Sequence, residues 1–149
     1  MYLSKLTLAN YRIFRSLEMD LPQGLVFIVG ANAQGKTTLL EAAYLLAIAK
    51  SYRTNTEREL IHWSVQKLSG VPETPGASGS EQTIISGDVE QQDGRLHLIV
   101  GLQVASEQGV GGALVKKQIR VNGVSTTAAG LVGGLNAVLF SASDIDMVQ

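Results

Sequence analysis

The chain has 149 residues, of which 45% are hydrophobic and 17% charged, with a formal net charge of −1 and no cysteine. This composition is typical of one globular domain or one lobe of a larger one, and it excludes a disordered chain, a disulfide framework and a thiolate metal site. Because the net charge is close to zero, any contact with nucleic acid must come from a local basic patch.

Nothing in the sequence predicts export or a membrane anchor. The opening residues "MYLSKLTLANYR" are alternating and polar, without the apolar region of a secretory signal. The longest nearly apolar run, 39–49, is interrupted by Glu41 and is too short to span a bilayer. A cytoplasmic protein without a membrane partner is therefore the expectation.

The first part of the chain has the pattern of an α/β nucleotide-binding fold. Residues 2–9 and 17–21 alternate apolar and polar side chains and predict two strands. The continuous apolar run 25–29 predicts a strand buried on both faces. Residues 37–50, rich in leucine and alanine, predict a helix packed between layers, and residues 56–62 predict a short helix with Thr56 as N-cap.

The rest of the chain reads as an antiparallel meander that returns to α/β at its end. It contains predicted strands at 83–89 and 95–104 around Asp93–Gly94, a third at 114–121 before Asn122–Gly123, a weak helix at 126–135, a short buried strand at 137–140, and the start of a helix after residue 141. Two stretches rich in glycine and serine, about 69–82 and 106–112, predict flexible loops.

The segment "GANAQGKT", Gly30 to Thr37, matches the phosphate-loop pattern G-x-x-x-x-G-K-[ST] between a predicted strand and a predicted helix. Backbone N–H groups of 33–37 would cradle phosphates, Lys36 would reach the β- and γ-phosphate oxygens, and the Thr37 hydroxyl would coordinate Mg²⁺. The alternative is a glycine turn with a solvated lysine. The predicted nucleotide-binding residues are Gly30, Ala31, Asn32, Ala33, Gln34, Gly35, Lys36, Thr37 and Thr38.

Several segments occur in the order found in the RecF family of bacterial DNA replication and repair proteins, and the chain resembles that family. They are "LTLANYR" with its pair Tyr11–Arg12, "VGANAQGKT", "LLEAAYLLA", "KSYRT", "ERELIHW", "KKQIRVNG" and "NAVLFSASDIDMV". The chain departs from the family in reading S-Y-R-T for S-H-R-T at 51–54, and F-S-A-S-D-I for F-S-P-E-D-L at 140–145.

The resemblance implies a P-loop, ABC-ATPase-like head lobe with an antiparallel β subdomain. It implies ATP and Mg²⁺ as cofactors, an ATP-dependent homodimer, and a role in DNA repair and the SOS response. The implied partners are DNA with single-strand gaps or single-strand–double-strand junctions, and recombination mediator proteins.

Two catalytic elements of such ATPases are missing from the sequence. There is no Walker B strand ending in Asp-Glu, which holds the Mg²⁺ shell and positions the attacking water, and no L-S-G-G-Q-type signature. We therefore expect residues 1–149 to be the N-terminal part of a longer protein that binds ATP and hydrolyses almost none by itself. The alternatives are a nucleotide-switched dimerisation module and the head of another SMC-like ATPase.

Four basic residues outside the loop are candidates for contact with phosphate. Arg12 is predicted to reach the nucleotide, or else to be a solvated residue at a strand end. Arg53 is predicted to contact DNA or a phosphate, or else to join a surface cluster with Glu57 and Glu59.

In the basic strand that contains Lys117, Lys116 and Arg120 share one face and form a candidate patch for the DNA backbone. A solvated sheet face is the alternative. His62 and His97 have no metal partner at a useful spacing and are expected to be structural.

Overall fold

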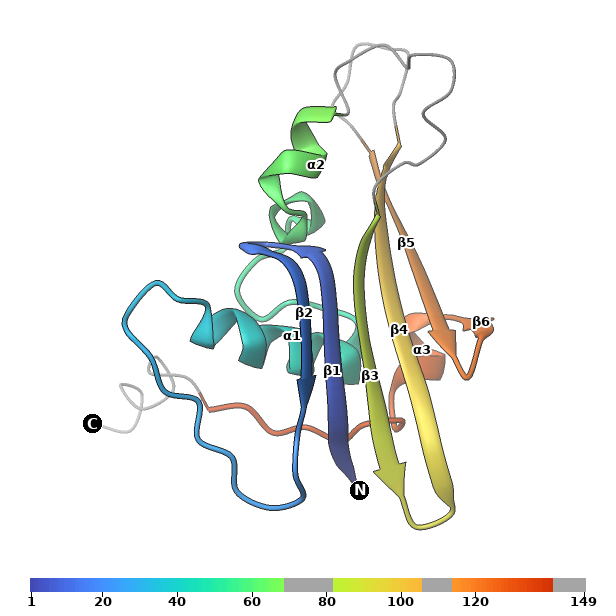
Figure 1. Ribbon diagram of the computed structural model, residues 1–149. Helices are drawn as coiled ribbons and strands as arrows, with labels where there is room; N and C mark the ends of the chain where they lie inside the picture. The colour runs from blue at the N-terminus through green and yellow to red at the C-terminus, as the bar shows by residue number, and fades with distance from the viewer. Residues whose placement is uncertain (69–81, 106–113, 141–149) are drawn as a thin grey trace, which may run out of the picture.

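A computed structural model describes residues 1–68, 82–105 and 114–140. Its centre is a six-stranded antiparallel sheet with the strand order β2-β1-β3-β4-β5-β6 (Figure 1). The strands are β1 (Tyr2–Tyr11), β2 (Phe14–Asp20), β3 (Thr83–Gln91), β4 (Gly94–Ala105), β5 (Leu114–Val121) and β6 (Val124–Thr126). The helices are α1 (Lys36–Ile48), the 3₁₀ helix η1 (Glu57–Leu60), α2 (Trp63–Leu68) and α3 (Ala128–Leu131).

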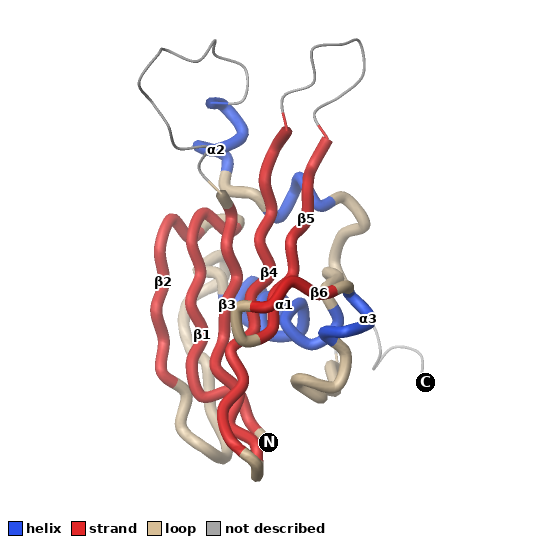
Figure 2. Tube along the Cα trace, turned by 90° about the vertical axis from the view of Figure 1, so that its right-hand side faces the viewer, coloured by secondary structure: helices blue, strands red, loops and turns tan. Residues whose placement is uncertain are grey.

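The helices α1 and α3 cover one face of this sheet and leave the other face to solvent (Figure 2). The covered face carries the alternate residues of each strand, among them Leu8 and the directly paired Ile85, which are fully buried. Leu46 of α1 packs over Gly87, where an added Cβ would lie 2.8 Å from the Leu46 side chain. A glycine at this position therefore allows the helix to approach the sheet closely.

Most of the predicted elements are confirmed, with the usual uncertainty at their ends. The predicted helix 37–50 is α1, and the predicted strand 114–121 is β5 with the same bounds. Asn122 and Gly123 form the tight turn into β6 with φ values of 49° and 81°, as a turn of this type requires. The strand β6 itself and the helix α2 were not predicted.

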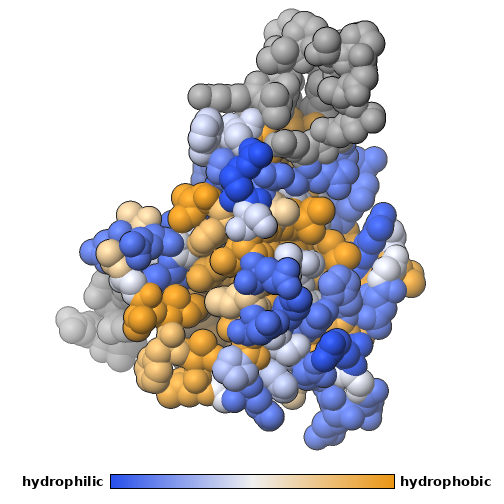
Figure 3. All heavy atoms as spheres, in the orientation of Figure 1, coloured by the Kyte–Doolittle hydropathy of each residue, from blue (hydrophilic) through white to orange (hydrophobic). Residues whose placement is uncertain are grey.

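Two predicted strands are wrong. Residues 25–29 and 137–140 form no strand, and both run outside the sheet (Figure 1). Their apolar side chains are largely in solvent, with exposed fractions of 81% at Leu25, 79% at Phe27 and 84% at Val138. Apolar residues of this kind gather at the lower left of the space-filling view (Figure 3). An apolar run forms a strand only when a neighbouring strand pairs with its backbone, and the sheet described here provides none.

Smaller differences concern the short helices and the predicted loops. The weak helix predicted at 126–135 is only the four-residue α3, which Thr127 begins by accepting a hydrogen bond from the N–H of Gly130. Thr56 does occupy the N-cap of η1, but its side chain makes no capping bond. The predicted loops and the predicted helix after residue 141 lie outside the described residues, apart from Gln82.

Among residues 1–68, 82–105 and 114–140, no helix has the length and apolar character needed to cross a bilayer.

Candidate nucleotide-binding site

The loop before α1 has backbone geometry that depends on Gly35. This residue is the N-cap of α1 with φ of 91°, in the left-handed region. A Cβ at Gly35 would lie 2.6 Å from Cζ of Phe14, so both the conformation and the space require glycine. Ala33 also has a positive φ, 64°. The loop is therefore a tight turn that leads directly into the first residue of α1.

The N-terminus of α1 is open to an anion. Its N-cap makes no side-chain hydrogen bond, and its first turn contains no acidic residue. Ala31, Asn32, Ala33, Gln34 and Thr37 are at least partly exposed. The first N–H groups of a helix have no partner within the helix, and the aligned peptide dipoles add partial positive charge there. These properties favour a bound phosphate.

The side chain of Lys36 folds back over the loop. Its Nζ donates hydrogen bonds to the carbonyl oxygens of Gly30 and Ala31, the second at 2.7 Å, while Oε1 of Gln34 accepts from the N–H of Ala31 at 3.1 Å. The ammonium group is thus held at the loop, where phosphate oxygens could replace these carbonyls as its partners. Thr37 is exposed at the start of α1, where its hydroxyl would be the ligand of a Mg²⁺ ion, and the residues of the loop fit a nucleoside triphosphate.

The side chain of Thr38 faces the core, since only 6% of the residue is exposed. Its predicted contribution to the nucleotide site is thereby limited to its backbone N–H.

Arg12 follows β1 and is bound to a carboxylate of α1. Its Nε donates to Oε2 of Glu41 at 2.5 Å and its Nη2 donates to Oε1 at 2.6 Å, a bidentate pair. The Glu41 side chain is completely buried, and that of Arg12 is 16% exposed. The backbone N–H of Arg12 also donates to the carbonyl of Leu60. Arg12 and Glu41 therefore connect the end of β1 with α1 and with η1.

Ser51 and Arg53 complete this cluster from the loop after α1. The Ser51 hydroxyl donates to Oε1 of Glu41, and Nη1 of Arg53 lies 3.5 Å from Oε2. The surface cluster considered for Arg53 with Glu57 and Glu59 is therefore wrong, because its partner is the buried Glu41. The twelve positions between the two residues explain the error, since the chain leaves α1 after Ile48 and turns back before Arg53 meets Glu41.

The cluster keeps Glu41 ionised. Burial by itself would raise the pKa of Glu41, but hydrogen bonds from Arg12 and Ser51 and the charges of Arg12 and Arg53 outweigh it and hold the pKa below its ordinary value. Burial also raises the pKa of the neighbouring Tyr11, whose Oη is buried without a hydrogen-bond partner. Both groups are thus fixed in one protonation state near neutral pH.

This shift predicts acid sensitivity. Because the unfolded chain protonates Glu41 at a higher pH than the folded protein, the contribution of Glu41 to stability is complete above about pH 4.5 and disappears as the pH falls through the folded pKa. The free energy of unfolding can be measured by urea denaturation at about pH 7 and about pH 3. We expect its decrease between these two pH values to be larger in the unaltered protein than in Glu41→Gln. Parallel pH profiles would contradict this role.

The basic strand β5 divides its cations between two faces. Lys116 and Arg120 are exposed on the open face, as predicted. Lys117 lies on the covered face, where its Nζ pairs with Glu57 and donates to the carbonyl of Ala49 at 2.9 Å. The candidate patch for the DNA backbone is therefore limited to the two exposed cations.

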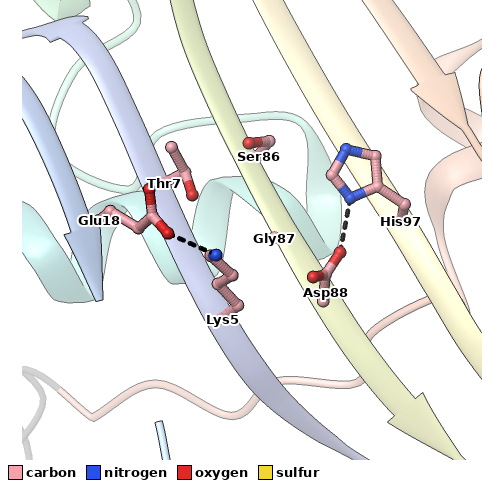
Figure 4. A pocket seen from close by; sticks show the side chains of 7 residues that line it. All are labelled: Lys5, Thr7, Glu18, Ser86, Gly87, Asp88 and His97. Carbon is pink, nitrogen blue, oxygen red and sulfur yellow. Dashed lines mark hydrogen bonds and ion pairs between the residues drawn. The ribbon is translucent and has the colours of Figure 1, made fainter. Parts of the chain in front are cut away.

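A hollow on the open face of the sheet contains two pairs of titratable side chains (Figure 4). Nδ1 of His97 lies 2.6 Å from Oδ1 of Asp88, and Nζ of Lys5 lies 2.5 Å from Oε1 of Glu18. Within the described part of the chain, no three histidine, cysteine, aspartate or glutamate side chains gather as a metal site. The hollow is thus explained by surface pairs between neighbouring strands.

Glu41 and Ser51 bind the candidate arginines Arg12 and Arg53, and this contact was not predicted from the sequence. A signal was present, because Glu41 interrupts an otherwise apolar run in the helix that follows the phosphate loop. A carboxylate in such a position is almost never buried without a partner. The arginine that would satisfy it could not be chosen from the sequence.

Comparison with known proteins identifies the family and the fold of the chain. Residues 1–90 match the model of the AAA ATPase domain family. The DNA replication and repair protein RecF of Roseiflexus castenholzii is 36% identical over 99% of this chain and 36% of its own length, and that of Limosilactobacillus fermentum is 38% identical over 100% and 34%. The chain therefore spans about a third of the length of these curated relatives.

A solved structure of the recombination mediator protein RecF with ATP, in the RecFOR pathway, superimposes with a TM-score of 0.74 at 27% identity. The match covers 99% of this chain and 35% of that protein. These similarities confirm the predicted fold class, a P-loop, ABC-ATPase-like head lobe with an antiparallel β subdomain, and the predicted resemblance to RecF.

Proposed function

The chain belongs to the AAA ATPase domain family and is similar along its whole length to RecF proteins, and on that premise we propose that it is the ATP-binding part of a RecF-like DNA replication and repair protein. It binds ATP with Mg²⁺ and takes part in recombinational repair in the cytoplasm. In a chain of the relatives' full length, ATP favours a homodimer on gapped or junction DNA that works with recombination mediator proteins.

The open N-terminus of α1 beneath the loop 30–37 is the observation that carries this proposal. No side chain caps the helix at Gly35, so the first backbone N–H groups of α1 can donate to a triphosphate. The Lys36 side chain, held at the loop, supplies positive charge. Titration of the chain with ATP by calorimetry tests the proposal directly, in the presence of Mg²⁺ and then of a chelator. Heat of binding that depends on Mg²⁺ supports it, and its absence contradicts it.

Hydrolysis is expected to be almost absent from residues 1–149, because the sequence has neither a Walker B strand nor a signature motif. Phosphate release measured over hours should match a sample without protein. Turnover that disappears in the Lys36→Ala protein would contradict this expectation.

The exposed face of β5 is proposed to bind the phosphate backbone of DNA. Lys116 and Arg120 lie on one face of this strand, with Gln118 between them. Each phosphate that a cation neutralises contributes about one to the slope of log affinity against log salt. We therefore expect Lys116→Gln/Arg120→Gln to weaken binding to gapped DNA and to reduce that slope by about 2. Fluorescence anisotropy over a range of salt concentrations measures both quantities.

The matched control for that double variant is Lys5→Gln/Arg95→Gln. It removes the same charge from other positions on the sheet, where both cations are already paired with Glu18 and Glu90. An equal effect in both double variants would show a general influence of charge and would remove β5 as a DNA-binding strand.

The alternative is a nucleotide switch that controls dimerisation alone, and the missing hydrolytic motifs favour it for these residues. Sedimentation with MgATP distinguishes the two. If MgATP makes the protein dimerise but does not change its affinity for DNA, the result supports the switch.

A further inference from the structure

Trp63, the first residue of α2, has an exposed aromatic ring that plays no part in the nucleotide site. Its exposed fraction is 61%, and it is the only tryptophan of the chain. Tryptophan is a large apolar residue that proteins usually bury for the most part. Such a ring in solvent is the kind of side chain that proteins use to bind a partner.

The backbone that leads to Trp63 is attached to the end of β1. The N–H of His62 donates to the carbonyl of Asn10 at 2.9 Å. An isolated antiparallel bridge pairs Ile61 with Tyr11 beside this bond. The sheet therefore fixes the position from which the Trp63 side chain extends.

The ring of Trp63 is also ordered by its neighbours. It lies on the ring of His62, with centroids 5.4 Å apart and planes inclined by 33°. His62 is itself only 4% exposed, and its Nδ1 lies 2.8 Å from the hydroxyl of Ser64. The same hydroxyl accepts a hydrogen bond from Nη1 of Arg15 on β2. A ring that is already ordered loses little entropy when a ligand binds to it.

The surroundings of this ring are polar and basic. Arg15 and Arg58 are exposed, and Glu59 is an exposed carboxylate of η1. Ile61 and Val65, two positions to either side, are only 2% and 5% exposed. A protein interface has an apolar core, which these buried side chains do not provide. An exposed aromatic ring beside arginines matches the sites at which proteins bind single-stranded nucleic acid, with bases stacked on the ring and phosphates paired with cations.

We propose that Trp63 is a stacking platform for a base of single-stranded DNA, and that Arg15 contacts a phosphate of the same strand. The base is an unpaired one at a gap or junction, because bases inside a duplex stack on each other and do not reach a protein ring. This inference rests on the function proposed above, in which the protein binds gapped DNA. Two views place α2 and the start of β5 at the same end of the sheet, which allows one DNA molecule to contact both (Figure 1, Figure 2).

The fluorescence of Trp63 tests the proposal in the unaltered protein. Because the chain has one tryptophan, its emission reports on this site alone. Titration with an oligothymidine, which forms no duplex with itself, should quench the emission as a base stacks on the ring. Duplex DNA of the same length should leave the emission unchanged, even where it binds to β5.

Replacement of Trp63 tests the contribution of the ring to affinity, measured by anisotropy of a labelled oligothymidine. Trp63→Ala should weaken binding by about five- to hundredfold, because base–aromatic stacking is lost. Trp63→Phe keeps a smaller ring and should keep part of the affinity, whereas Trp63→Leu keeps apolar area without a ring and should not. The matched control Phe27→Ala removes a ring that is 79% exposed elsewhere and should change the affinity by less than about twofold.

The salt dependence of binding tests Arg15. Arg15→Gln should weaken binding of the oligothymidine and reduce the slope of log affinity against log salt by about 0.7, the value for one phosphate of a single strand. Arg15→Lys keeps the charge and should keep the slope. If Arg15 only orders Ser64, the Gln variant would leave the slope unchanged, and its role as a phosphate contact would be removed.

Thermal unfolding shows which variants are folded, and the fluorescence of the unaltered protein decides the question where one is not. Binding of the oligothymidine without quenching, and with full affinity in a folded Trp63→Ala protein, would overturn the proposal. So would a Trp63→Ala protein that sediments with a smaller mass and keeps its affinity for DNA, because the ring would then be a protein contact. If gapped DNA binds but Trp63 has no influence, the proposed function stands and only this inference fails. If no DNA of any kind binds, both fail.

Discussion

Replacement of Lys36 by alanine is expected to lower the affinity for MgATP by about two orders of magnitude. Lys36 is the first residue of α1, and its ammonium lies on the loop carbonyls of Gly30 and Ala31. In the complex it would make charge-assisted hydrogen bonds to phosphate oxygens, each contributing about 1.5–3 kcal/mol. Removal of two such bonds corresponds to a factor of at least about 100 in affinity, which calorimetric titration with MgATP measures.

The control for this variant is Lys50→Ala, an exposed lysine just after the other end of the helix. It changes the net charge equally and should leave the nucleotide affinity within about twofold, as is usual for a surface substitution. Both variants should unfold close to the temperature of the unaltered protein, because both side chains lie at the surface or partly exposed. An unchanged affinity in Lys36→Ala would remove the loop as the phosphate site.

Replacement of Arg12 by alanine is expected to have the largest effect on stability. It leaves the buried carboxylate of Glu41 with the Ser51 hydroxyl and the distant Arg53 as its partners. Removal of one member of a buried ion pair typically costs about 3–5 kcal/mol, a large fraction of the stability of a domain. Urea unfolding at neutral pH measures the decrease.

Two further variants identify the cause of that decrease. Lys5→Ala breaks a surface pair with Glu18 on the same sheet and should have little effect. Arg12→Met/Glu41→Leu replaces the buried pair by apolar side chains and should recover most of the stability. A double variant as unstable as Arg12→Ala would point to poorer packing instead of an unpaired charge.

The sequence predicted the parts of this structure that depend on neighbours along the chain. The loop 30–37 has fixed spacing, α1 is rich in leucine and alanine, and the turn at Asn122–Gly123 has residues that tolerate positive φ. Each of these is determined within a few residues, so the local pattern contains the information.

The features that the sequence did not predict depend on distant partners. Residues 25–29 have the composition of a buried strand, and their exposure follows from the absence of a strand beside them in the described sheet. Glu41 and Arg12 are 29 positions apart, and no periodicity connects them. Alternation along β5 puts Lys117 on the face opposite Lys116, but its partner there, Glu57, is 60 positions away and could not be predicted.

The pair Arg12–Glu41 also determines how α1 is rotated against the sheet. This helix is apolar on most sides, from the buried Leu45 and Leu46 to Leu40, which is 49% exposed. Burial of apolar area alone would thus favour several rotations about the helix axis by similar amounts. A rotation that moved Glu41 away from Arg12 would leave a charge buried without its partner. One ionic contact thereby selects a single orientation of the helix and, with it, the direction in which the phosphate loop faces.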